Sequence, residues 1–267
     1  MALAAGRGGR PPSDAVWYRQ AMLVTGGFVV LPLLVAAGFV LACDQADRRV
    51  GTPAPARRRR TLGVAAATIA WLAITLLAAA SGVLRRFDLV PPPFAAVPPA
   101  VLALGLSVAC SRLGTRLVRG LPLWILVGSQ VFRFPLELLM HRAFVEGVMP
   151  VQMSYSGWNY DILTGISAGL LGAWLYAGSV PRWIVGAWNA LGFLLLVNIV
   201  TIAVLSTPIF RAFGGGERLN TFVADPPFVW LPAILVTAAL AGHVLVWRKL
   251  AAERSAVAPA TYRRSAS

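Results

Sequence analysis

Long apolar runs separated by short basic stretches are the main pattern of this chain. The first run, AMLVTGGFVVLPLLVAAGFVLAC over residues 21–43, exceeds the roughly 18 apolar residues needed to cross the ~30 Å hydrocarbon core of a bilayer. We therefore expect an all-α polytopic transmembrane bundle with N- and C-terminal tails at residues 1–20 and 249–267. The seven expected spans lie near residues 21–43, 61–84, 94–111, 121–145, 161–180, 183–206 and 228–248.

Composition supports a membrane protein and excludes a soluble fold. Hydrophobic residues make up 58% of the 267 residues and charged residues only 13%, against roughly 25% charged in an average soluble domain. The net charge of +14 could indicate nucleic-acid binding. However, the arginines lie between the apolar runs, as the positive-inside rule requires. The expected partner is therefore the lipid bilayer, with no nucleic acid.

The distribution of arginine also predicts an orientation. With seven spans, one side of the membrane receives the arginine-rich stretches 48–60 and 112–119 together with the basic C-terminal tail. The rule then places the C-terminus in the cytoplasm and the N-terminus outside. This parity argument depends on residues 94–111 crossing the membrane, because losing one span would reverse it.

A polar stripe interrupts the run near 121–145, in the stretch QVFRFPLELLMHR. At about 100° per residue, Gln130, Arg133, Glu137 and His141 fall on one narrow helical face. An arginine near the bilayer midplane costs roughly 2.5–3.5 kcal/mol, so Arg133 needs a partner. Glu137, one turn later, is the expected counter-charge. Pro135 between them removes a backbone donor and favours a kink.

Three further polar residues are expected at a similar depth in the outer half of the membrane. Asn159 and Asp161 stand at the start of the run near 161–180, and Asn198 lies within the next run. They could converge with the stripe to form a pocket. Two alternatives stay open: Asp161 is simply the N-cap of its helix, and Arg133 and Glu137 form a structural seam that fastens neighbouring helices.

Small residues and loop lengths predict how the bundle packs. Gly165, Gly169 and Gly172 share a helical face, which lets another helix approach closely. The loops 146–160 and 207–228 are long enough to fold over the bundle as lids or re-entrant elements. Ordinary surface loops are the alternative.

The sequence predicts no cofactor, no metal site and no catalytic motif. Cys43 and Cys110 are too far apart in sequence for a metal motif and are expected to be two buried thiols. His141 and His243 would lie roughly 17 Å apart along the membrane normal, at 1.5 Å rise per residue. A haem held between both is therefore disfavoured, whereas one histidine with another ligand stays open. His243 is isolated from other polar groups in the sequence and is expected to be a helix-packing or interfacial residue.

The block of residues 130–168 resembles a family of uncharacterised bacterial multi-pass membrane proteins. The similar features are the Q-x-x-R-x-x-x-E face, the G-x-x-P break and the N-x-D-I-L-T-G start of the following helix. The resemblance implies a bacterial inner-membrane protein with this block at its centre, and it implies no activity.

The leading functional hypothesis is an outward-facing polar pocket that binds or passes a small solute or protons, as in a transporter. A second hypothesis is a non-catalytic assembly or scaffold subunit, whose polar face docks a membrane-protein partner. A third is a membrane-embedded redox protein or enzyme.

Overall fold

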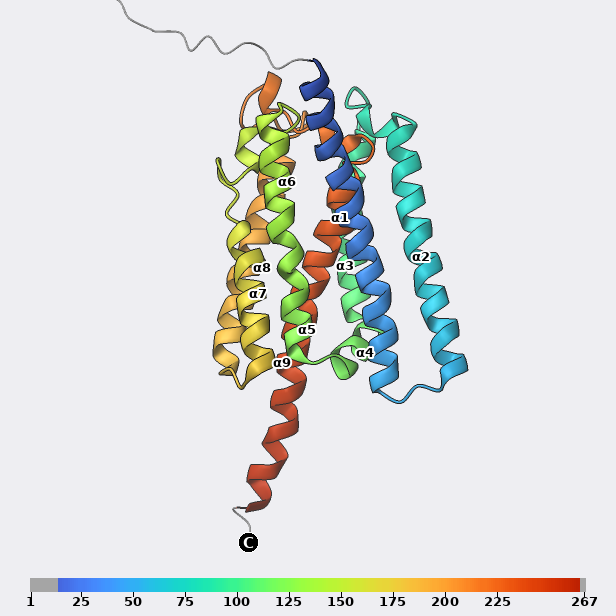
Figure 1. Cartoon of the computed structure of the whole chain (residues 1–267), viewed down its shortest axis with the longest axis vertical. Helices are drawn as coiled ribbons and strands as arrows, with labels where there is room; N and C mark the ends of the chain where they lie inside the picture. Colours follow the sequence, from blue (N-terminus) through green and yellow to red (C-terminus); the bar gives the residue numbers. More distant parts are fainter. Residues whose placement is uncertain (1–13, 265–267) are drawn as a thin grey trace, which may run out of the picture.

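The computed structural model describes residues 14–264, and within them the chain is helical with no strand (Figure 1). The α-helices are α1 (Asp14–Arg49), α2 (Ala54–Ala80), α3 (Val97–Cys110), α4 (Arg112–Gly120), α5 (Leu123–Gly128), α6 (Arg133–Val145), α7 (Ile162–Ala177), α8 (Arg182–Leu205) and α9 (Thr237–Arg264). Six 3-10 segments, η1 (Val83–Arg85), η2 (Pro93–Ala96), η3 (Ser129–Phe132), η4 (Val151–Met153), η5 (Gly216–Arg218) and η6 (Phe222–Ala224), and one π-helix, η7 (Leu231–Val236), lie between them.

Six helical segments of the described chain are long and apolar enough to cross a bilayer, which confirms the expected polytopic helical fold. They are Leu23–Arg49, Ala54–Ala80, Pro93–Cys110, Leu123–Val145, Arg182–Leu205 and Leu231–Arg254.

The bounds of the expected spans differ from those of the helices, and the second and fifth spans are two examples. The run near 61–84 forms a helix that begins earlier, at Ala54, and ends at Ala80. The run near 161–180 forms only the 16-residue helix α7. The segment before it, residues 146–161, enters the bundle as irregular backbone that contains only the short 3-10 helix η4.

Helix α9 is the centre of the bundle and α2 lies at its edge. Within the span Leu231–Arg254, which includes most of α9, 61% of the apolar stretch is buried inside the protein, against 17% within the span Ala54–Ala80 of α2. Helices α3, α5 and α8 all pack against α9. The C-terminal part of α9 projects beyond the other helices (Figure 1), so it continues as a helix past residue 248, where the tail was expected to begin.

The arginine-rich ends of the helices gather at one end of the bundle, together with the α1–α2 connection and α4 (Figure 1). Helix α4 begins at Ser111, whose hydroxyl oxygen accepts hydrogen bonds from the backbone of Leu113 and Gly114, a favourable N-cap. Asp47 on α1 lies within ion-pair distance of Arg60 on α2 and Arg116 on α4. These contacts tie the basic end together.

Residues 146–161 form a re-entrant segment from the opposite end. Gln152, in η4, is buried and donates to the Ser206 hydroxyl at 3.0 Å and to the Arg218 carbonyl at 2.7 Å. Further along, Asn159 reaches Glu137, which lies eight residues before the end of α6, or about 12 Å along the helix axis. Irregular backbone at this depth is tolerated because it is covered by protein.

The start of the last span is a π-helix that is tied to α2 by two tryptophans. Trp71 on α2 donates to the carbonyl of Ala233 at 3.0 Å, and Trp230 donates back to the carbonyl of Leu72 at 3.1 Å. Single π-helical turns are uncommon and often occur at functional sites. Here the turn forms part of a cavity wall.

Candidate functional site: a buried ionic cluster beside an apolar cavity

The polar stripe lies where its span is interrupted. The segment 123–145 is helical throughout, but the 3-10 turn Ser129–Phe132 interrupts its α-helical hydrogen bonding between α5 and α6. Pro135 is the third residue of α6, so its missing N–H falls in the first turn, where a helix has no internal acceptor for it. The proline is thus tolerated directly after the 3-10 turn.

Arg133 pairs with Asp161, so the expected pairing with Glu137 is wrong. The Arg133 Nε donates to Asp161 Oδ2 at 2.6 Å, and Nη2 donates to Oδ1 of the same carboxylate. Both side chains are buried, with 1% and 5% of their surface exposed. The re-entrant segment brings the Asp161 carboxylate deep enough to outcompete the residue one turn away. Asp161 stands at the N-cap position of α7, but its side chain makes no capping bond there, because its carboxylate binds Arg133.

The glycines of α7 allow it to lie directly against the interrupted span. A Cβ atom at Gly165 would overlap the backbone of Arg133 and Phe134. At Gly172 it would meet the Cα of Gly128 at 3.0 Å, whereas at Gly169 the nearest atom, on Val131, is 3.5 Å away. The close approach expected from the small residues occurs at the level of the ion pair, with backbone against backbone.

His243 on α9 completes the cluster, which adds polar contacts to its expected role in helix packing. Its Nε2 lies 2.7 Å from Arg133 Nη1, and its Nδ1 lies 2.8 Å from Asn189 Oδ1. Because a guanidinium can only donate, Nε2 must accept and Nδ1 carries the proton. The imidazole is therefore neutral in this arrangement, and Asn189 holds it by also donating to the His243 carbonyl.

Glu137 lies next to the ion pair but is not part of it. Its Oε2 accepts from Asn159 Nδ2 at 2.7 Å, and no ion pair within 4.0 Å in residues 23–254 involves its carboxylate. Asn159 is a hub for the re-entrant segment, because it also donates to the Met153 carbonyl and accepts from the Asp161 backbone N–H.

The other expected pocket residues lie apart from the ion pair. Gln130 is buried against Gly242, and its Oε1 has no hydrogen-bond partner. His141 stacks on Tyr155 with ring centroids 4.3 Å apart. Asn198 is partly exposed and donates to the carbonyl of Trp158. The structure thus brings together Arg133, Glu137, Asn159 and Asp161 of the predicted set, and adds His243 and Asn189.

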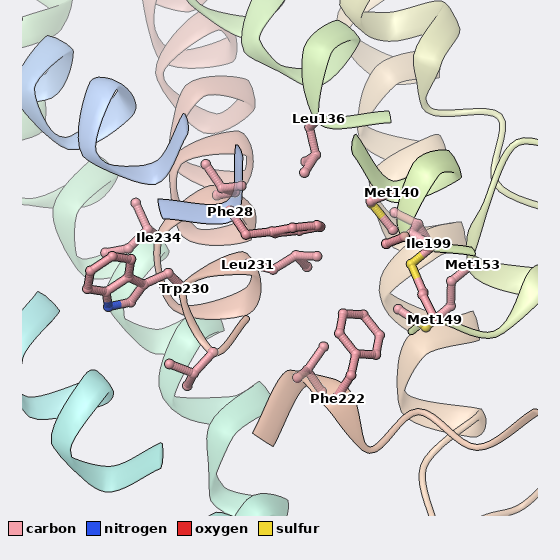
Figure 2. Packing of buried hydrophobic residues seen from close by; sticks show 14 of the residues in the cluster. Phe28, Leu136, Met140, Met149, Met153, Ile199, Phe222, Trp230, Leu231 and Ile234 are labelled. Carbon is pink, nitrogen blue, oxygen red and sulfur yellow. The ribbon is translucent and has the colours of Figure 1, made fainter. Parts of the chain in front are cut away.

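A cavity of about 80 Å³ extends from this cluster toward the loop 206–230. Its wall is apolar, not polar as expected, apart from five side chains. Leu136, Met140 and Ile199 face Leu231 across the packing shown in Figure 2. The polar lining residues are Arg133, Glu137, Asp161, Thr207 and Asn220.

The cavity has a polar group at each end and partly exposed residues along one side. On α8 the lining runs from Leu196 to Val204, or about 12 Å at helical rise, and it continues to Thr207 just past the end of the helix. Thr207 and Asn220 lie at the end away from the ion pair. Leu102 of α3, which is 41% exposed, and the partly buried Val204 of α8 also line it. The side of the cavity formed by α3 and α8 therefore includes partly exposed residues.

The two ring nitrogens of His243 leave it no position for a haem iron. Both ring nitrogens of His243 are engaged, by Arg133 and Asn189, so His243 offers no free nitrogen to an axial position. His141 directs Nδ1 to the hydroxyls of Ser154 and Ser156.

Of the two cysteines, Cys43 is buried as expected, whereas Cys110 is exposed.

Comparison of the chain with protein-family models, with curated proteins and with solved structures finds no match.

Proposed function

We propose that this membrane protein binds a small, largely apolar molecule, taken from the bilayer into the cavity between α3 and α8. We also propose a bacterial inner membrane as its location, on the resemblance of residues 130–168. The observation that carries the binding proposal is the cavity itself, which has an apolar wall, partly exposed residues of α3 and α8 along one side and a buried ionic cluster at one end. Ligand sites are typically apolar with a few oriented polar groups.

Irregular backbone around the cavity supports movement of the ligand as well as binding. The 3-10 turn η3, the re-entrant segment and the π-helix η7 all border the site. Interrupted helices near the bilayer midplane are common at substrate sites of transporters, where they supply polar groups and points of bending. Transport of the bound molecule is the extension of the proposal that these elements favour.

The scaffold hypothesis has less support. It required the polar stripe to dock a helix of another protein, but Arg133 and Glu137 bond to Asp161 and Asn159 of the same chain. For the redox hypothesis, an absorbance spectrum of protein purified from its native host is the direct test, because a haem or flavin band would favour it.

Photolabelling tests the binding proposal. The protein is placed in nanodiscs of neutral lipid and labelled with a decanol derivative that carries a diazirine on its chain. We expect saturable labelling on residues of the cavity wall, such as Met140 and Ile199. Ala239→Leu, which adds three carbons inside the cavity, should abolish the saturable part.

Ala70→Leu is the matched control, because Ala70 lies exposed on α2, away from the cavity lining. It should leave the saturable labelling unchanged. Labelling of the cavity wall that persists in Ala239→Leu, or that never saturates in the unaltered protein, would overturn the proposal.

A further inference from the structure

We infer that the polar group of the bound molecule is a cation or a hydrogen-bond donor, with an alkylammonium as the preferred class and Glu137 as the residue that holds it. This inference rests on the proposed function, since it names the ligand class for the same cavity. It follows from the hydrogen-bond partners of the five polar side chains that line the cavity.

The positive charge of Arg133 is not free for a ligand. Its three nitrogens are all engaged: Nε and Nη2 with Asp161, Nη1 with His243, and both terminal nitrogens with the Gly192 carbonyl at 3.4 and 3.5 Å. Such a guanidinium has five N–H groups and no further donor. An anionic ligand would have to displace a carboxylate that already binds in a bidentate manner, which is the strongest geometry for this pair.

The negative charges are not balanced in the same way. Asp161 is neutralised by Arg133, and His243 is neutral because its Nε2 accepts from that arginine. Glu137 is left as a second carboxyl group without a second cation. Its Oε2 accepts from Asn159, while the side chain lines the cavity. A buried carboxylate needs a counter-charge or donors, and a ligand can supply both.

The far end of the cavity also presents an acceptor. Thr207 uses its hydroxyl proton on the Val204 carbonyl at 2.7 Å, and Asn220 uses its amide N–H₂ on the Ala203 carbonyl at 3.0 Å. Asn220 Oδ1 is buried without a hydrogen-bond partner. Leaving such an acceptor unpaired is costly, so this end too favours a donor. Two independent polar groups thus point to the same ligand chemistry.

Competition against the photolabel tests the ligand class. Decylamine, which is protonated at neutral pH, decanol and decanoate share one chain length and differ in the polar group. Their measured partition into nanodiscs of neutral lipid puts each on the same scale of mole fraction in the bilayer. We expect decylamine to displace the label at a mole fraction at least about tenfold below that of decanoate, as for a charge-assisted hydrogen bond.

Glu137→Gln removes the charge but keeps an oxygen that can accept from Asn159. In this variant decylamine should lose its advantage over decanol, whereas decanol should compete within about twofold of its original level. Glu146→Gln is the matched control, because the Glu146 carboxylate is also buried but pairs with Arg142 and does not line the cavity. It should keep the preference for decylamine.

The outcomes separate the two proposals. Equal competition by all three probes, or an amine preference that survives in Glu137→Gln, overturns the inference about ligand class and leaves cavity binding in place. If the cavity is not labelled in a saturable way by the decanol probe, the proposed function fails, and the inference fails with it.

Discussion

The Arg133–Asp161 ion pair should be among the most costly interactions to break in this protein. Asp161→Asn removes the only ion-pair partner that the structure gives Arg133 within residues 23–254 and leaves a guanidinium buried at 1% exposure. Losing two charge-assisted hydrogen bonds at about 1.5–3 kcal/mol each agrees with the ~3–5 kcal/mol measured when one partner of a buried pair is removed. We therefore expect a loss of about 3–5 kcal/mol in the free energy of unfolding.

The assay is unfolding in mixed micelles of dodecylmaltoside and dodecyl sulfate, followed by circular dichroism. A double-mutant cycle with Arg133→Met should give a coupling energy of about 2–3 kcal/mol, because removing both charges leaves no unpaired ion.

The exposed pair between Arg85 and Asp225 is the matched control. It has the same two-bond geometry, at 2.5 and 2.6 Å, but Arg85 is 60% exposed. Asp225→Asn should cost less than about 1 kcal/mol. If Asp161→Asn and Asp225→Asn destabilise the protein equally, the reasoning that burial makes the Arg133 pair strong is refuted.

Three further changes test the packing around the site. Gly165→Ala should destabilise the protein by about 1–3 kcal/mol in the same unfolding assay, since the new Cβ would meet the backbone of Arg133 and Phe134. Gly186→Ala on α8 is the control and should be neutral or stabilising, because a Cβ there meets nothing within 4 Å. Equal effects of the two variants would contradict the backbone contact at Gly165. Asn159→Ala should raise the rate of hydrogen–deuterium exchange across residues 151–161. Asn198→Ala loses a single hydrogen bond to Trp158 and should leave exchange across these residues unchanged. Unchanged exchange in Asn159→Ala would argue against the role of Asn159 as a hub. Ala239→Leu should raise the free energy of unfolding by about 0.5–2 kcal/mol by filling the cavity, and a loss of stability would mean that the space beside Ala239 is smaller than described.

The inward-facing stripe follows from helical spacing alone. Gln130, Arg133 and Glu137 are each only 1% exposed, as expected from residues that share one narrow face. The glycine face of α7 was equally clear from sequence, because residue size and spacing are local properties.

The partners of the stripe could not be read from spacing in the same way. Glu137 is near Arg133 in sequence, but Asp161 reaches it only because the 16 residues 146–161 descend into the bundle instead of covering it. His243 looked isolated because its two polar partners lie 54 and 110 residues away. Neither the depth of a loop nor the pairing of distant helices is encoded in a local pattern.

The cavity also could not be predicted from the sequence pattern. Its lining residues come from four α-helices, the π-helix, the 3-10 segments η2 and η3 and two loops, and most of them taken alone are ordinary apolar positions. A polar pocket was expected because polar residues are conspicuous in an apolar span. In the structure they instead form one end of an apolar cavity, where most of them are satisfied by their own chain.

A crystal structure with 10-bromodecylamine bound tests the central claim most directly, since anomalous scattering locates the bromine without ambiguity. With the ammonium at Glu137 and the chain along α8, the account predicts a bromine peak inside the cavity, on the side of Thr207 and Asn220. Bromine peaks found only on the lipid-facing surface, for example beside the exposed Leu194, with none in the cavity would contradict it.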